Sequence, residues 1–252
     1  MSVRLLVVSA VLLAGGAVFA AAPAGPSAAA KAAFDRGVKK EGAGDHQAAV
    51  VEFDTAIAAS PTFAEAYANR GLVKLRNGDS AGAFADLNQA IALDPKLAPA
   101  FKNRGKAHSA AGDPPKALAD FRKCAELTPK DGDAHYNIGL MLLRIGNPEE
   151  AKAAFDKAIA LNPRDAASFA NRATALRKLG DTKGALQDYG KAIALDPGDG
   201  AALANRGMML AAGGDSAGAE KDFRASMAAF EKKGDARMAD AARRELMKLG
   251  AK

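Results

Sequence analysis

The sequence lacks tryptophan entirely and has only one cysteine and three histidines among its 252 residues. Because Cys124 is alone, no disulfide can form within the chain, and its stability must come from packing. His46, His108 and His135 show no metal-ligand spacing and have no cysteine or carboxylate cluster beside them. Phosphate-binding loops, serine elbows and dinucleotide-binding glycine patterns are also absent. The sequence therefore predicts no catalytic residue, no bound metal and no cofactor.

The sequence does contain one pattern that recurs every 34 residues, and we number its positions from 1 at Ala30. Glycines stand at position 8 (Gly37, Gly71, Gly105, Gly139, Gly207) and at position 15 (Gly44, Gly78, Gly112, Gly146, Gly180, Gly214), and Ala173 is the one exception. Alanines recur at position 20 (Ala49, Ala83, Ala117, Ala151, Ala185, Ala219) and prolines at position 32 (Pro61, Pro95, Pro129, Pro163, Pro197). Six copies run from Ala30 to Glu231 without an insertion or deletion. Such a pattern is typical of a repeat array and not of a globular domain.

Each copy is predicted to form two helices. The first ends at the glycine of position 15, and an aspartate or asparagine follows as the N-cap of the second helix. A large side chain at position 24 fills the space between the two helices, while small residues let them approach: the large residues are Phe53, Leu87, Phe121, Phe155, Tyr189 and Phe223. Cys124 stands where other copies have alanine or serine, so we interpret it as a small buried residue. A single hairpin cannot bury its apolar face, so the copies must stack.

These residues resemble the tetratricopeptide repeat family, whose pattern places glycine, alanine, phenylalanine and proline at the same offsets. The resemblance covers about four fifths of the chain, and implies an all-α fold: an α-solenoid, a right-handed superhelix of helix-turn-helix repeats. Two departures stand out. Copy six has Glu231 where the closing proline belongs, and arginine replaces the usual leucine at position 7 in five copies (Arg36, Arg70, Arg104, Arg172, Arg206).

An acid at position 23 accompanies each of these arginines, and both residues change together in copy four, to Ile138 and Ala154. A short turn between antiparallel helices brings positions 7 and 23 opposite each other. We therefore expect an ion pair within each hairpin: Arg36 with Glu52, Arg70 with Asp86, Arg104 with Asp120, Arg172 with Asp188, and Arg206 with Asp222.

Four segments follow from the order of the chain. Residues 1–20 combine Arg4, an apolar core and small residues before a cleavage position, which predicts a secretory signal peptide and a periplasmic or secreted protein. An uncleaved membrane anchor is the alternative, and it would be the chain's only membrane contact. Residues 21–29 form a linker that we expect to be disordered, and the repeats occupy residues 30–231. Residues 232–252 hold an amphipathic helix at 236–249, with Met238, Leu246 and Leu249, that caps the last repeat and turns Arg237, Arg243, Arg244 and Glu245 to water.

Position 6 carries asparagine in five copies: Asn69, Asn103, Asn137, Asn171 and Asn205. The resemblance implies that this position faces the concave surface, where an asparagine ladder in some family members grips the backbone of an extended peptide. A carboxamide offers both a donor and an acceptor, as a peptide unit does. Inheritance by duplication without a function is the other explanation. Cationic and aromatic side chains share this face of the helices and complete the candidate peptide-binding set: Arg76, Lys102, Lys106, Tyr136, Arg144, Arg177 and Lys178.

Three functions remain open. The first is an exported, non-enzymatic scaffold that binds a polypeptide segment, acidic with apolar residues, in its concave groove. The second is an array that self-associates into a larger structural assembly, and the third is an accessory subunit of an enzyme complex. The net charge of +6 is spread among interleaved acids in every copy, so no nucleic-acid-binding surface is predicted.

Overall fold

The computed structural model of the protein describes residues 25–250, so the predicted signal at residues 1–20 lies outside the described residues. Within that range the chain forms thirteen helices and no strand, as predicted. The helices are α1 (Ala28–Gly42), α2 (His46–Ala59), α3 (Ala64–Arg76), α4 (Ser80–Leu93), α5 (Ala98–Ala110), α6 (Pro114–Leu127), α7 (Gly132–Arg144), α8 (Pro148–Leu161), α9 (Ala166–Lys178), α10 (Thr182–Leu195), α11 (Gly200–Ala212), α12 (Ser216–Lys232) and α13 (Ala236–Gly250).

The turn inside every copy has the predicted chemistry. All six glycines of position 15 have positive φ, between 76° and 87°, a conformation that costs side-chain-bearing residues energy. The next residue caps the second helix in each copy: Asp45, for example, accepts a hydrogen bond from the backbone N–H of Ala48. Gly234 and Asp235 repeat this turn between α12 and α13, so α13 folds back on α12 as the second helix of a copy folds on the first.

The hairpins are held together by a close approach between position 8 and position 24. A Cβ atom added at Gly105 would lie 2.8 Å from the ring of Phe121, and one at Gly139 would lie 2.6 Å from the ring of Phe155. Real Cβ atoms do not come this close to a neighbour, so position 8 must be glycine where the ring lies flat against it. In copy five Ala173 occupies position 8 and is fully buried with Tyr189.

Small residues also fill the contacts between copies. Cys124 is 1% exposed, and burial raises the pKa of its thiol. This confirms its interpretation as a buried packing residue.

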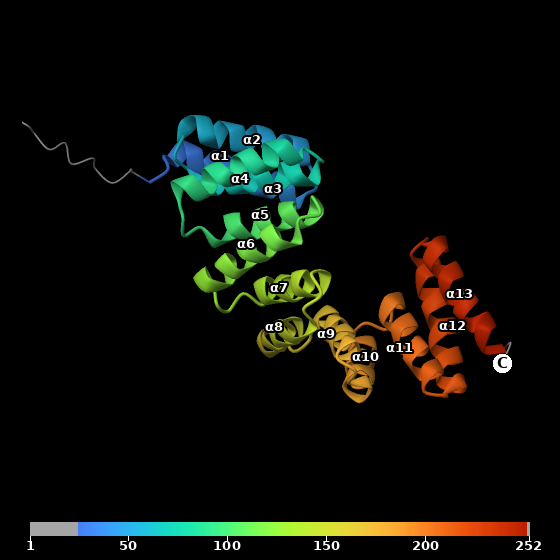
Figure 1. The fold of residues 1–252 in the computed structure, drawn as a ribbon. Helices are drawn as coiled ribbons and strands as arrows, with labels where there is room; N and C mark the ends of the chain where they lie inside the picture. Colours follow the sequence, from blue (N-terminus) through green and yellow to red (C-terminus); the bar gives the residue numbers. More distant parts are fainter. Residues whose placement is uncertain (1–24, 251–252) are drawn as a thin grey trace, which may run out of the picture.

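The stack bends toward one side. First helices of successive copies touch one another, since α1 contacts α3, α3 contacts α5 and α7 contacts α9. Because this side is the more crowded one, the first helices line the concave face and the second helices the convex face. Figure 1 shows the resulting elongated array, with its two ends far apart.

Both ends differ from the sequence-based expectation. Helix α1 begins at Ala28, inside the expected linker, because the side chain of Ser27 caps it by accepting a hydrogen bond from the N–H of Ala30. The backbone N–H of Ser27 also donates a hydrogen bond to the side chain of Ser60, which ends α2. Helix α12 runs 17 residues, since no proline ends it at position 32. Helix α13 packs on α12 and α11, as expected of a capping helix, with Ala239 and Ala242 buried and Leu246 and Leu249 half-buried, but Met238 stays 38% exposed.

We predict that Gly105→Ala lowers the free energy of unfolding by about 1–3 kcal/mol, because the new methyl group overpacks against Phe121. Gly42→Ala is the matched control: it is also helical, but nothing lies within 4 Å of its Cβ position, so stability stays constant or rises by up to about 1 kcal/mol. Urea unfolding followed by circular dichroism measures both. Equal midpoints for the two variants would contradict the role given to position 8.

Candidate functional site

The five asparagines of position 6 lie on the first helices, and all but Asn103 are half-buried. Three of them donate a side-chain hydrogen bond to the carbonyl four residues earlier in their own helix: Asn69 to Glu65 at 2.8 Å, Asn137 to Asp133 at 2.7 Å, and Asn171 to Ala167 at 2.9 Å. Asn103 is 7% exposed and reaches the carbonyl of Ala68 in the preceding copy, at 3.4 Å. Asn103 therefore has a packing role that the others lack.

The acceptor side of the row is unused. None of the five carboxamide oxygens accepts a hydrogen bond from a residue between 25 and 250. Asn205 goes further, because its amide nitrogen also donates none within this range and the side chain borders two surface cavities. Each copy from two to six thus has one carboxamide oxygen without a partner among the described residues, and the half-buried Asn69, Asn137, Asn171 and Asn205 are more accessible than Asn103.

Neighbouring side chains, most of them acidic, engage several of the cations that the sequence placed on this face. Lys102 lies 2.9 Å from Asp131, whose hydrogen bond raises the pKa of Lys102 although partial burial opposes its charge. Arg76 pairs with Glu41 of the first copy, and Arg144 donates to the Ser109 hydroxyl at 3.1 Å. Neither Glu41 nor Asp131 was among the residues predicted for this face.

The other predicted cations are free. Lys106, Arg177 and Lys178 are exposed and form no ion pair with any residue of the described chain. Partial desolvation of its ammonium group, and then the nearby charge of Lys102, lowers the pKa of Lys106. The ring of Tyr136 packs against Phe155, with the two ring centroids 6.0 Å apart. The hydroxyl of Tyr136 accepts a hydrogen bond from Asn171 of the next copy at 3.3 Å, and this bond links the two copies on the concave face.

Sequence reasoning missed Met208. It occupies position 9 of copy six and is 45% exposed. Extending the groove positions beyond copy five would have identified it, because Lys106 occupies the same position in copy three.

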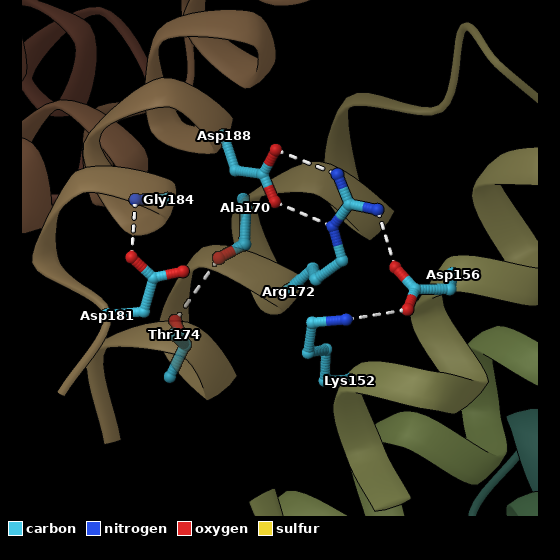
Figure 2. Close-up of polar contacts among 8 residues, drawn as sticks. All are labelled: Lys152, Asp156, Ala170, Arg172, Thr174, Asp181, Gly184 and Asp188. Atoms are coloured by element: carbon cyan, nitrogen blue, oxygen red, sulfur yellow. Dashed lines mark hydrogen bonds and ion pairs between the residues drawn. The ribbon is translucent and has the colours of Figure 1, made fainter. Parts of the chain in front are cut away.

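Ion pairs tie the hairpins together, as predicted. In all five copies the position-7 arginine bonds the position-23 acid, and in the last four the acid is nearly buried: Arg172 Nε lies 2.6 Å and Nη2 2.8 Å from the two oxygens of Asp188. The structure adds a bond that we did not predict. Arg172 Nη1 also reaches Asp156 of the preceding copy, at 2.6 Å, and Lys152 pairs with that same carboxylate (Figure 2). The guanidinium of Arg172 therefore links α9 and α10, the two helices of its own copy, to α8 of the preceding copy.

In copy four both partners of the ion pair are replaced together by apolar residues. Ile138 and Ala154 stand at positions 7 and 23, and Arg122 stands where copies one and four carry Asp54 and Asp156. Arg122 instead pairs with Glu150 at 2.7 Å, above a cavity of about 460 Å³ with Ile138 in its lining. The exchange of charge for apolar contact noted in the sequence is thus real, and it leaves open space between α6 and α8.

No group of three or more metal-ligating side chains occurs among residues 25–250. Burial lowers the pKa of His108, because its effect outweighs that of the nearby charge of Asp120, which acts in the opposite direction. No helix in the described part of the chain has the length and apolar character to cross a membrane.

Two-helix copies that stack with their first helices along a concave face define an α-solenoid repeat protein. Comparison with known proteins supports this class of fold. Models of the tetratricopeptide repeat match residues 34–98, 102–166 and 166–199. The chain therefore belongs to the tetratricopeptide repeat family. No curated protein matches it in sequence.

Solved structures share the fold. PilF of Pseudomonas aeruginosa is 20% identical with a TM-score of 0.75, and the match covers 86% of this chain and 97% of that one. MamA is 26% identical with a TM-score of 0.60, over 65% and 96% of the two chains. YrrB, described as a tetratricopeptide repeat protein with an unusual peptide-binding site, is 23% identical with a TM-score of 0.62, over 76% and 97%.

We predict that Arg172→Ile alone lowers the free energy of unfolding by roughly 3 kcal/mol, because it leaves the buried carboxylate of Asp188 without its partner. Adding Asp188→Ala should restore most of the loss, since copy four packs isoleucine against alanine at these positions. Arg243→Ala is the surface control and should change stability by less than about 1 kcal/mol, because its pair with Glu231 is 43% and 50% exposed. A double-mutant cycle from urea unfolding gives the coupling, and purely additive effects would refute the bridge.

Proposed function

We propose that this protein is a non-enzymatic scaffold that binds an extended polypeptide segment along its concave groove. The observation that carries the proposal is the row of unused carboxamide oxygens, one in each copy from two to six. A tetratricopeptide array is a scaffold for protein-protein interaction, and the peptide-binding site named for YrrB supports the same use here by analogy.

Backbone spacing fits this use. Packed helices lie about 8–10 Å apart, and an extended chain advances about 3.3 Å per residue. Neighbouring asparagines would then meet roughly every third residue of a bound segment. Each carboxamide oxygen would accept a peptide N–H, and the side chain of the bound residue would not enter that bond. Such contacts hold many sequences, so selectivity must come from the charges and apolar side chains around the row.

The free charges favour an acidic partner. Lys106, Arg177 and Lys178 are cations that no acid within residues 25–250 neutralises, whereas Arg76 and Lys102 have acidic partners. Half-buried Leu72, Leu75, Leu140 and Leu143 lie on the same face and would contact apolar side chains. We therefore propose a ligand that combines acidic and apolar residues.

We also propose that the protein works outside the cytoplasm, in the periplasm or as a secreted protein. The basis is the pattern of residues 1–20, a positive residue followed by an apolar core and small residues. A periplasmic or secreted scaffold without disulfides depends on packing between copies for its stability, as the buried glycine-aromatic contacts provide.

Replacing Asn137, Asn171 and Asn205 by alanine should weaken binding of peptides selected on the wild-type protein from a random decapeptide library by at least tenfold. Each lost amide contact contributes about 0.5–1.5 kcal/mol. Asn77→Ala, at the exposed end of α3, is the control and should bind normally. Isothermal titration calorimetry measures the affinities. Failure to select any peptide, or equal affinity for the triple variant, would reject groove binding.

Size-exclusion chromatography with light scattering over a range of concentrations separates the scaffold from a self-associating array. A monomer is expected. A concentration-dependent oligomer that binds no selected peptide would favour the assembly hypothesis.

Expression of the full chain in a bacterial host should yield a protein that begins at Ala21 in the soluble envelope fraction, because cleavage after Ala20 leaves small residues at the two subsites before the cut. N-terminal sequencing or intact mass measures this. An intact Met1 in that fraction would contradict the cleaved signal.

A further inference from the structure

The concave face changes character at its C-terminal end. Two cavities lie side by side there, of about 490 Å³ and about 230 Å³, and Asn205 and Met208 line both. Arg177 and Met209 border the larger cavity, whereas Phe230 and Met238 border the smaller one, between α11 and α13. Met208 thus forms a ridge between two depressions.

Apolar side chains are left exposed at this place. Met208 is 45% exposed and Met238 is 38% exposed. Methionine is unbranched and polarisable, and it adapts to differently shaped apolar groups. The capping helix therefore does not seal the groove, and its Met238 supplies one wall of it.

Three polar side chains around the two cavities have no partner among the described residues. Asn205 is the one asparagine of the row with neither its donor nor its acceptor engaged by a described residue. Arg177 at the larger cavity and Arg244 at the smaller one are exposed and form no ion pair within residues 25–250. Glu245 is the only acid lining either cavity, and Lys248 pairs with it at 2.7 Å. The surroundings of Met208 thus carry a net positive charge.

We propose that this end of the groove is the anchoring subsite for an extended polypeptide segment with two apolar side chains flanked by acidic residues. The proposal rests on groove binding and specifies where and how the ligand is held. Side chains at i and i+2 of an extended chain point to the same side, about 7 Å apart. One apolar side chain of the ligand enters the cavity on each side of Met208, and Asn205 forms a hydrogen bond with the ligand backbone between these two side chains. Arg177 and Arg244 attract the carboxylates of the flanking acidic residues.

The probe is a capped heptapeptide, acetyl-Gly-Asp-Leu-Ser-Leu-Asp-Gly-amide, titrated into the full mature chain. Two control peptides replace both leucines by serine or both aspartates by asparagine. The double variant Met208→Ser with Met238→Ser should bind the probe at least tenfold more weakly, because two apolar contacts are lost. Met247→Ser is the matched control: Met247 is also on α13, is 65% exposed and lines neither cavity, so its affinity should equal that of the wild type.

Carbon-13 labelling of the methionine methyl groups reports the place of binding without any substitution. The probe should shift the resonances of Met208 and Met238 and leave those of Met247 and of buried Met141 in place. The serine control peptide should cause no shift, and the asparagine control should bind several-fold more weakly, with less dependence on salt.

Three results would overturn the inference. The probe fails to bind the wild-type chain, or it binds without moving Met208 and Met238, or a dimer that both serine substitutions abolish shows that a second copy occupies the cavities. If peptides selected from the decapeptide library still bind and depend on Asn137 and Asn171, groove binding stands and only this subsite is wrong. If those peptides do not bind either, the proposed function fails as well.

Discussion

The contact on which the whole array depends is the one between position 8 and position 24, where a helix backbone meets a large buried side chain. Gly139 lets the ring of Phe155 lie where a methyl group would otherwise be, and the same approach recurs in five of the six copies. Close approach fixes the distance between the two helices, and that distance fixes the shape of the surface on which the next copy packs. One short contact, repeated at a spacing of 34 residues, therefore sets the geometry of the entire chain.

A second layer of contacts is polar and joins the first helices to the second helices. In copy five Arg172 forms charge-assisted, forked hydrogen bonds to Asp188 within the hairpin and one further bond to Asp156 of the preceding copy. The energetic value of the bridge comes from nearly buried acids such as Asp188, which is 3% exposed. Copy four shows that the bridge can be replaced, provided that Ile138, Ala154 and Arg122 change together. Packing at position 8 permits a smaller change: the one departure from glycine is Ala173, another small residue, which is fully buried beside Tyr189.

The two faces of the array have different constraints. Side chains that pack inside the hairpins recur with the repeat, and those of position 24 are fully or almost fully buried. Side chains on the concave face are free to differ, and they do: copy three carries Lys106 and copy six carries Met208 at the same position. The groove positions that differ between copies therefore give the groove its individual character, whereas the asparagines of position 6 recur in copies two to six.

The sequence by itself determined the repeats, the turns and the partners within a hairpin. Periodic glycines such as Gly78, N-caps such as Asp79 and the pairing of Arg172 with Asp188 all follow from short-range rules, because the residues involved lie at most 16 positions apart. Only the tertiary structure decided how copies meet. Asp131 neutralises Lys102 across 29 residues, and Met208 and Met238 come together across a hairpin whose curvature no single copy encodes. The physical reason is that a repeat specifies its own core, whereas the groove is made of surfaces from several copies, and its charges and cavities depend on the small angles at which those copies stack.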